Sequence, residues 1–364
     1  MTPVEQRVRG LGLHGRVKGR LGVNRVPRLA GLAVEGAEGA VTQREVLERL
    51  GLAGDEFAEG IFARSGVRTR NLRLDDDFLS RNLQGRTALV EDELLASATS
   101  LIDRLGAHRR PLGTVLTSSL YSLGCPTLAQ RLVDHYRMAP ATDRYHLTGV
   151  GCASAVPLLR LAGQALQCDP SRDVLVIAAE SMSSILMPAG PDDPRAKTVG
   201  SAIFGDGCAV AVLSNDAGAE GPAIVATQVH HVGGTLDAVV LEASGDDSHL
   251  HLARDLPDLA AADLARVLDS FLGDLGLSRT AIDHWMVHPG GRRIVEGVRD
   301  ALALDDDDVE LTWRALADHG NVGTPSIFYV LDTTIAQRRP APGQRGLAVT
   351  IGPGVTIGLM LLQW

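Results

Sequence analysis

Three residues far apart in the chain carry side chains suited to acyl transfer through a thiol. Cys152 lies in the run 145–155, Tyr-His-Leu-Thr-Gly-Val-Gly-Cys-Ala-Ser-Ala, directly before a long apolar helical pattern. His288 precedes Pro-Gly-Gly, and Asn321 lies in a later glycine-rich turn. A thiolate attacks acyl carbonyls, and a helix N-terminus or a nearby histidine favours the thiolate form. The three residues therefore form a candidate constellation for acyl chemistry on Cys152.

Each of these residues also has a structural interpretation when it is taken alone. A free cysteine is most often buried and unreactive. A histidine at a strand end and an asparagine in a glycine-rich turn are common for structural reasons. Taken alone, the other cysteines, Cys125, Cys168 and Cys208, are predicted to be structural. The order Cys, His, Asn on separate loops is what favours catalysis.

Composition narrows the class of protein. The chain has 364 residues, of which 45% are hydrophobic, so we expect a large core. A net charge of −9 argues against nucleic acid as the main partner. The cysteines show no metal-ligand spacing and are too few for a disulfide framework, which predicts no metal and a cytoplasmic location. No apolar run approaches the roughly 20 residues of a membrane span.

The first residues, 1–28, are rich in Arg and Gly, and Glu5 is their only acid. They lack the apolar region of a secretory signal. We expect a basic, flexible leader. The alternative is a docking arm for an acidic carrier protein or a neighbouring subunit.

The segments that must position the candidate residues alternate between strand and helix patterns. Thr42 and the residue pattern after it predict a capped helix. Pro157 fits only the first turn of a helix, so that helix is predicted to begin just after Cys152. This alternation predicts an α/β protein with layered sheets and helices. Strands are predicted at 28–34, 111–120, 145–150, 173–180, 207–214, 284–287 and, as two strands, 347–363, and helices at 42–52, 127–136, from about 154–157, and 263–275.

Short motifs resemble those of the type III polyketide synthase (chalcone-synthase-like) family of the thiolase superfamily, from about Leu29 to Trp364. This resemblance implies a thiolase-like layered α-β-α-β-α fold made of two similar halves. Residues 29–216 would carry the nucleophile, and residues 217–364 the histidine and asparagine. The motifs are Gly-Cys-Ala-Ser-Ala (151–155), Val-His-Pro-Gly-Gly (287–291), Gly-Asn-Val-Gly (320–323), Phe-Gly-Asp-Gly (204–207), Gly-Pro-Gly (352–354) and Ser-Gly-Val-Arg-Thr-Arg (65–70).

The resemblance also implies a mechanism. Cys152 would take an acyl group from a CoA thioester, and malonyl-CoA would then lose carbon dioxide. His288 and Asn321 would stabilise the enolate oxygen, and His288 would help to keep Cys152 ionised. Repeated extension and cyclisation would give a pyrone, a resorcinol or another phenolic product. The substrates would be acyl-CoA and malonyl-CoA, with no metal or redox cofactor, and the protein would be a homodimer.

Further positions follow from the same resemblance. Leu250 replaces a usual aromatic, and Gly323 replaces the serine of plant members, which suggests an aliphatic cavity and an alkyl starter. Phe204 would be a gatekeeper, with a core aromatic as the alternative, and Cys125 would reach across a dimer into the partner's cavity. The substrate-binding positions are Phe204, Leu250, Gly323, Cys125, Gly352, Pro353 and Gly354. The CoA-binding positions are Arg64, Arg68, Arg70, Gly290 and Gly291, although ordinary solvated arginines are equally compatible with the sequence.

Two other functions compete with this one. The first is a single condensation or acyl transfer of the ketoacyl-carrier-protein synthase III kind, supplied by acyl carrier protein. The second is a non-catalytic paralogue that binds acyl groups or acts as a scaffold. The complete Cys, His and Asn set argues against the second, because a scaffold has no physical need for all three.

Overall fold

The computed structural model describes residues 26–120, 122, 124–185, 195–244 and 247–364, without the side chains of 195 and 242–250. The predicted leader lies outside this description up to residue 25. Side-chain capping determines where two of the helices begin. The helix α2 (Gln43–Arg49) begins with a capping box between Thr42 and Glu45, and α6 (Leu128–His135) begins with one between Thr127 and Gln130.

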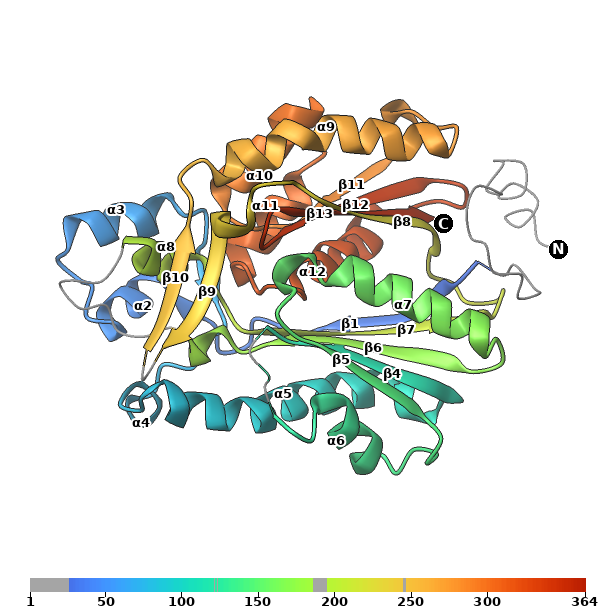
Figure 1. Ribbon diagram of the computed structural model, residues 1–364, viewed down its shortest axis with the longest axis horizontal. Coiled ribbons are helices and arrows are strands. Elements are labelled where there is room, and N and C mark those ends of the chain that lie inside the picture. The colour runs from blue at the N-terminus through green and yellow to red at the C-terminus, as the bar shows by residue number, and fades with distance from the viewer. Residues whose placement is uncertain (1–25, 121, 123, 186–194, 245–246) are drawn as a thin grey trace.

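Helices and strands alternate in layers through the molecule (Figure 1). One outer layer holds α9 (Leu256–Asp274) and α10 (Arg292–Leu302), and the other holds α5 (Leu83–Leu105) and α6. The helices α7 (Ala155–Cys168) and α12 (Ser326–Thr333) lie between two groups of strands. The strands near α9 are β11 (His284–Val287), β12 (Arg345–Gly352), β13 (Thr356–Gln363) and β8 (Ala223–His231), and those near α5 are β1 (Arg28–Val34), β7 (Gly207–Ser214), β6 (Asp173–Glu180), β4 (Leu112–Ser118) and β5 (Asp143–Leu147).

The two groups of strands join into a nine-stranded sheet of order β11-β12-β13-β8-β1-β7-β6-β4-β5. Only Arg28 and Ala223 pair across the junction of β1 and β8. The sheet can therefore change direction there and enclose the central helices. This arrangement confirms the predicted layered fold. The predicted boundary at 216/217 falls between β7 and β8, and the division into two similar halves stays a prediction.

Three apolar cores hold the layers together. The central core packs Val156 and Leu159 of α7 and Phe328 of α12 between the strand groups, with Val176 on one side and Ala348 on the other. A second core joins α9 and α10 to their strands, and a third joins α5 and α6 to theirs. Burial on both faces explains why β6 and β7 read as continuous apolar runs.

Most predicted strands and helices are confirmed, several of them with limits shifted by a few residues, and two of the differences have a clear local cause. The strand predicted to reach Val150 ends at Leu147, because Gly149 and Gly151 take positive φ values of 74° and 65° and break the extended backbone. The helix predicted from Asp263 begins at Leu256 instead. Its first turn contains Pro257, which suits a helix start.

Candidate active site

The nucleophile turn is built on glycine. Cys152 lies in a short 3-10 turn, Gly151–Ala153, which leads into α7 at Ala155. A side chain on Gly151 would place its Cβ 2.7 Å from Cδ of Pro353. Only glycine combines this close approach with the positive φ of Gly151. The sequence prediction that Cys152 precedes the first turn of α7 is confirmed.

The Gly-Pro-Gly segment packs directly on this turn. A Cβ atom on Gly352 would lie 2.6 Å from the backbone nitrogen of Ala153. Gly354 has a φ of 61°, again in the left-handed region. The end of β12 therefore supports the nucleophile turn from the C-terminal strand group, which gives Gly352, Pro353 and Gly354 a structural role. Their contact with substrate stays a prediction.

Asn321 is the polar residue in contact with the nucleophile. Its Oδ1 atom lies 3.8 Å from Sγ of Cys152 and accepts a hydrogen bond from the backbone N–H of Gly323 at 2.9 Å. Because that N–H needs an acceptor, the orientation of the amide is fixed. Its Nδ2 atom donates to the carbonyl of Gly290 at 3.3 Å. The second hydrogen on Nδ2 has no acceptor among the described residues and is available to a substrate oxygen.

His288 joins the same group through Gly290. It follows β11, is buried, and packs so closely on Gly290 that a Cβ there would lie 3.1 Å from Cδ2 of the imidazole. Among the described residues, neither ring nitrogen of His288 has a hydrogen-bond partner. Buried polar atoms without partners are rare, and they mark places where a ligand or water binds. The structure thus places Asn321 against Cys152 and links Asn321, through Gly290, to the turn that carries His288.

Burial governs the protonation of this pair. It raises the pKa of Cys152 to about 12, and the neighbouring Glu180 carboxylate adds to the increase. It lowers the pKa of His288 to about 4. Both directions favour a neutral thiol and a neutral imidazole. These directions oppose an ionised Cys152, and the role of His288 in ionising it stays a prediction.

Glu180 is a site residue that the sequence interpretation missed. Its buried carboxyl accepts the backbone N–H of Leu120 at 2.7 Å and lies 3.1 Å from Oγ1 of Thr324. The same hydroxyl lies 3.0 Å from the carbonyl oxygen of Gly151. It has one hydrogen, so it can donate to Gly151 or to Glu180 but not fully to both. A protonated Glu180 completes both contacts, and burial raises its pKa to about 7. The available signal was an acid at the end of the apolar strand 173–180.

The remaining residues predicted to bind substrate lie on several different elements. Phe204 pairs through its backbone with Asn321 and packs against a small apolar cluster that includes Met182 and Ile185. A Cβ on Gly323 would lie 2.8 Å from Cε of Met182, so the methionine occupies the space of a serine side chain. Leu250 pairs in β10 (Asp247–Leu252) with Leu241 of β9 (Val239–Ser244), and its side chain is outside the description. Cys125 is exposed.

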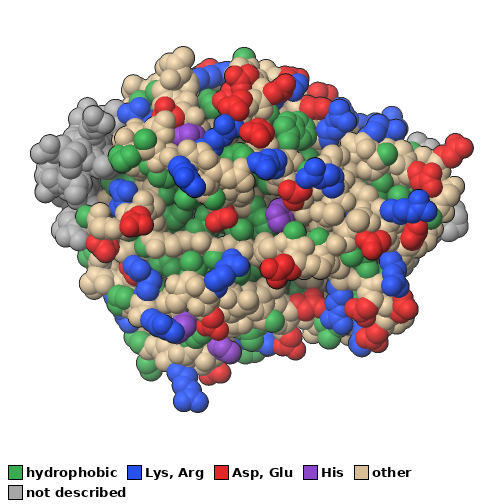
Figure 2. Space-filling view, turned by 180° about the vertical axis from the view of Figure 1, so that it is seen from behind, with side chains coloured by type: hydrophobic (Ala, Val, Ile, Leu, Met, Phe, Trp, Pro, Cys, Tyr) green, Lys and Arg blue, Asp and Glu red, His purple; other side chains and the backbone are tan. Residues whose placement is uncertain are grey.

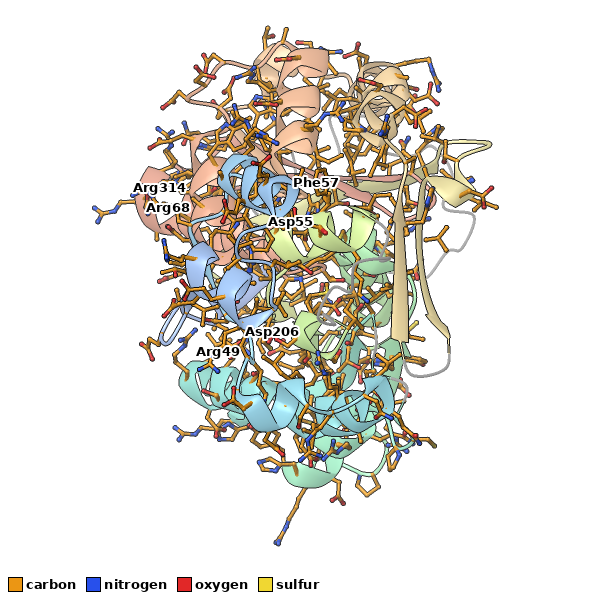
Figure 3. The ribbon with its side chains drawn as sticks, turned by 90° about the vertical axis from the view of Figure 1, so that its left-hand side faces the viewer. Arg49, Asp55, Phe57, Arg68, Asp206 and Arg314 are labelled. Carbon is orange, nitrogen blue, oxygen red and sulfur yellow. The ribbon has the colours of Figure 1, made fainter. Side chains whose placement is uncertain are left out.

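The predicted CoA arginines divide into two kinds. Arg64, at the end of α3 (Glu56–Arg64), is exposed, and so is Arg68, which pairs with Asp318 at 2.5 Å. Arg70 is fully buried, and both of its terminal nitrogens donate to backbone carbonyls. Figure 3 shows Arg68 near the left-hand edge of the view. The prediction that Arg70 contacts CoA phosphates is wrong, because its guanidinium does not reach solvent.

The described residues contain no group of three His, Cys, Asp or Glu side chains that could hold a metal ion. No helix among them is both long and apolar enough to span a bilayer. On the face shown in Figure 2, Lys and Arg side chains lie among Asp and Glu side chains.

Comparisons with known proteins agree with this geometry. Residues 42–272 match the family model of FAE1/type III polyketide synthase-like proteins, and residues 224–364 match the C-terminal domain of chalcone and stilbene synthases. The chain is 29% identical over 314 residues to 1,3,6,8-tetrahydroxynaphthalene synthase of Streptomyces peucetius subsp. caesius, covering 82% of this chain and 81% of the relative. It is 27% identical over 355 residues to 3,5-dihydroxyphenylacetyl-CoA synthase of Streptomyces toyocaensis, covering 93% and 90%.

A solved structure shows the same arrangement over almost the whole chain. PKS-I of the brown alga Ectocarpus siliculosus superposes with a TM-score of 0.84 at 25% identity, covering 94% of this chain and 100% of that one. The family model alone spans more than half of the sequence. With its layered fold and these matches along its length, the chain belongs to the type III polyketide synthase family.

Proposed function

We propose that this type III polyketide synthase loads an acyl group from a CoA thioester onto Cys152 and extends it with malonyl-CoA. The observation that carries the proposal is the contact of Cys152 with Asn321, whose amide also binds the carbonyl of Gly290, the residue that packs on the unpartnered ring of His288. The catalytic roles below are inferences from that grouping. Decarboxylative condensation is the reaction class of the family.

In the loading step, the thiol proton of Cys152 passes to the imidazole of His288 as the sulfur attacks the thioester carbonyl. The bond from that carbonyl to the CoA sulfur breaks, and CoA leaves as a thiolate that takes up the proton. Transfer at the moment of attack suits a pair that is neutral at rest. Burial raises the cost of a permanent ion pair, which explains why the charge is formed only when substrate is present.

In the extension step, malonyl-CoA loses carbon dioxide, and its thioester becomes an enolate. The free N–H of Asn321 and an N–H of His288 donate to the enolate oxygen, as an oxyanion hole does. The enolate carbon attacks the acyl-Cys152 carbonyl, the bond from carbon to sulfur breaks, and the longer chain is carried on CoA. Removal of one such donor costs about a hundredfold to a thousandfold in rate in comparable sites.

The starter is proposed to be aliphatic. Leu120, Phe204 and Leu241 are partly exposed and pack on the buried side chains of Met182 and Ile185. Leu120 also approaches Gly151 beside the nucleophile, with its Cδ1 atom 3.9 Å from where a Cβ would be. An apolar wall beside Cys152 favours an alkyl chain over a polar starter.

The protein is also proposed to act as a homodimer. The strand β5 is the last in the sheet and pairs only with β4, so one of its backbone edges is unpaired in the described chain. Tyr145 on this strand is 54% exposed. An exposed edge strand with a large apolar side chain is a site for pairing with a second copy. The proposal that Cys125 then enters the partner's cavity rests on the family resemblance.

The test is intact-protein mass spectrometry of the full chain after mixing with a panel of acyl-CoAs, with and without malonyl-CoA. We expect an adduct with long alkyl-CoAs that Cys152→Ala abolishes and Cys168→Ala, at an exposed cysteine on the end of α7, retains. Malonyl-CoA should convert the adduct into a released pyrone or phenolic product. An adduct formed only from acyl carrier protein would contradict CoA delivery, and no adduct from either source would contradict the function.

A further inference from the structure

Arg70 caps the carbonyl end of a helix from inside the protein. It lies on β3 (Thr69–Arg70) and is fully buried. Its Nη1 atom donates to the carbonyl of Ala202 at 2.6 Å, and its Nη2 atom donates to that of Ser201 at 2.7 Å. Both carbonyls belong to the last turn of α8 (Arg195–Ile203), where helical carbonyls lack partners within the helix. A cation also suits the negative end of the helix dipole.

The last residue of this helix and the second residue after it bind the backbone of Asn321. The carbonyl of Ile203 accepts the backbone N–H of Asn321 at 2.7 Å. The carbonyl of Asn321 in turn accepts the backbone N–H of Gly205 at 3.1 Å, and Phe204 lies between these two bonds. The carbonyls of three successive residues are therefore occupied by Arg70 on one side and Asn321 on the other. A shift of the α8 end would move Asn321 with it.

The aliphatic part of the Arg70 side chain packs between the loop of Gly205 and the loop of Gly320, which the backbone bonds of Asn321 join. A Cβ on Gly205 would lie 3.1 Å from Cβ of Arg70, and a Cβ on Gly320 would lie 3.4 Å from its Cδ. The guanidinium also lies 5.8 Å from the ring centre of Phe62, within reach of a cation–π contact. Burial lowers the pKa of Arg70 to about 9, and the nearby carboxylate of Asp206 opposes this shift. The side chain thus has little freedom to move away.

We propose that Arg70 is a positioning residue for the condensation, which holds the α8 end so that the backbone of Asn321 keeps its amide beside Cys152 and His288. Arg70 touches no reacting atom in this arrangement and acts through the Ile203–Gly205 segment. The proposal rests on the proposed role of Asn321 in malonyl-CoA decarboxylation. It gives a function to an arginine that the sequence alone assigned to the CoA site.

The first test compares Arg70→Met with Arg86→Met in the full-length protein. Arg86 is a matched control, because it is also fully buried, donates to the backbone carbonyls of Leu79 and Arg81, and lies over an aromatic ring, that of Phe78. We expect Arg70→Met to lower kcat for malonyl-CoA decarboxylation by about tenfold to a hundredfold, since small displacements of positioned groups cost rates of this size. The KM for malonyl-CoA and the rate of acylation of Cys152 should change by less than about threefold.

The control should leave decarboxylation per folded molecule unchanged, even where the melting temperature falls. Equal losses of decarboxylation and Cys152 acylation in Arg70→Met, or the same decarboxylation loss in Arg86→Met, would show a merely structural role. Unchanged decarboxylation in a folded Arg70→Met would also overturn the proposal. Should Arg70→Met not fold, the test passes to Arg70→Lys, whose single ammonium can hold the helix end only in part.

A double-mutant cycle separates this proposal from the function on which it rests. Asn321→Ala alone should lower decarboxylation, and Arg70→Lys should add no further loss in that background, because residues that act through one another are not additive. Additive losses would contradict the coupling and leave the role of Asn321 intact. If Asn321→Ala does not lower decarboxylation, the proposed role of Asn321 fails, and Arg70 cannot act through it.

Discussion

The two strand groups contribute opposite kinds of chemistry to one site. The group near α5 and α6 supplies Cys152 and the buried carboxyl of Glu180. Burial of Cys152 and the nearby Glu180 carboxylate both disfavour negative charge on the sulfur. The group near α9 and α10 supplies His288, whose ring nitrogens have no partner in the described chain, and the loop after α11 (Glu310–His319) supplies Asn321. In the proposed mechanism, one side carries the acyl group and the other stabilises negative charge on the substrate. This division predicts that separate substitutions remove attachment and charge stabilisation.

The largest expected effect comes from Cys152→Ala, which removes attachment and leaves charge stabilisation. Product formation should fall by at least about a thousandfold, because no acyl intermediate can form. Malonyl-CoA decarboxylation should stay within about threefold of the original rate, since His288 and Asn321 are untouched. Release of carbon dioxide and of product would be measured side by side. Loss of both would show that the two strand groups do not act separately.

The variant His288→Gln tests whether His288 both accepts the proton of Cys152 and stabilises the enolate. Decarboxylation should fall by about a hundredfold to a thousandfold, as expected for an oxyanion donor. Alkylation of Cys152 by iodoacetamide should slow by about tenfold, because the thiol loses its proton acceptor. Alkylation is followed by mass spectrometry. Unchanged alkylation would confine His288 to charge stabilisation.

Glu180→Gln should remove the smaller of two causes that oppose charge on the sulfur, the nearby carboxylate, and leave the larger one, burial. The amide can still accept the N–H of Leu120 and donate to Thr324, so the packing is kept. Without the carboxylate the pKa of Cys152 falls, and alkylation near neutral pH should speed up by about threefold to tenfold. Slower alkylation in a folded variant would contradict this direction.

The same variant has a signature in stability. Folding raises the pKa of Glu180 from 4.5 to about 7, so the folded state binds its proton more tightly. The stability from this group is full below pH 4.5 and is lost as the pH rises through about 7. From about pH 5 to about pH 8, the wild-type protein should lose about 2–3 kcal/mol of unfolding free energy relative to Glu180→Gln. Denaturant titrations at both pH values measure this difference, and parallel pH profiles would contradict it.

The smallest effect is expected from a substitution at Gly323, in the loop of Asn321, which packs against Met182 and Glu180. A serine there would have its Cβ 2.8 Å from Met182 and 3.0 Å from Glu180, with φ held at 67°. Gly323→Ser should cost about 1–3 kcal/mol of unfolding free energy. Gly276→Ser is the matched control, because Gly276 has a φ of 68° and no atom within 4 Å of the added Cβ. Met182→Ala should restore part of the loss in Gly323→Ser, and equal losses in both serine variants would exclude crowding.

Local sequence was enough to place most elements and the catalytic constellation. The apolar run 173–180 and the segment 284–287 became strands with the predicted limits, and Thr42 and Thr127 cap the helices that follow them. These features depend on propensity, capping and periodicity, which act over a few residues. The order of the Cys, His and Asn motifs likewise indicated the family before any contact was known.

Contacts between distant residues were decided only by the tertiary structure. Nothing near Glu180 in the chain shows that it lies beside Cys152, and nothing near Arg70 shows that it is buried against α8 rather than exposed as Arg68 is. The space filled by Met182 against Gly323 is likewise invisible in the sequence. The sequence by itself determined the elements and the reactive groups, because those follow from short-range sterics and chemistry. The tertiary structure decided burial, protonation and positioning, because each depends on packing among residues that the chain separates widely.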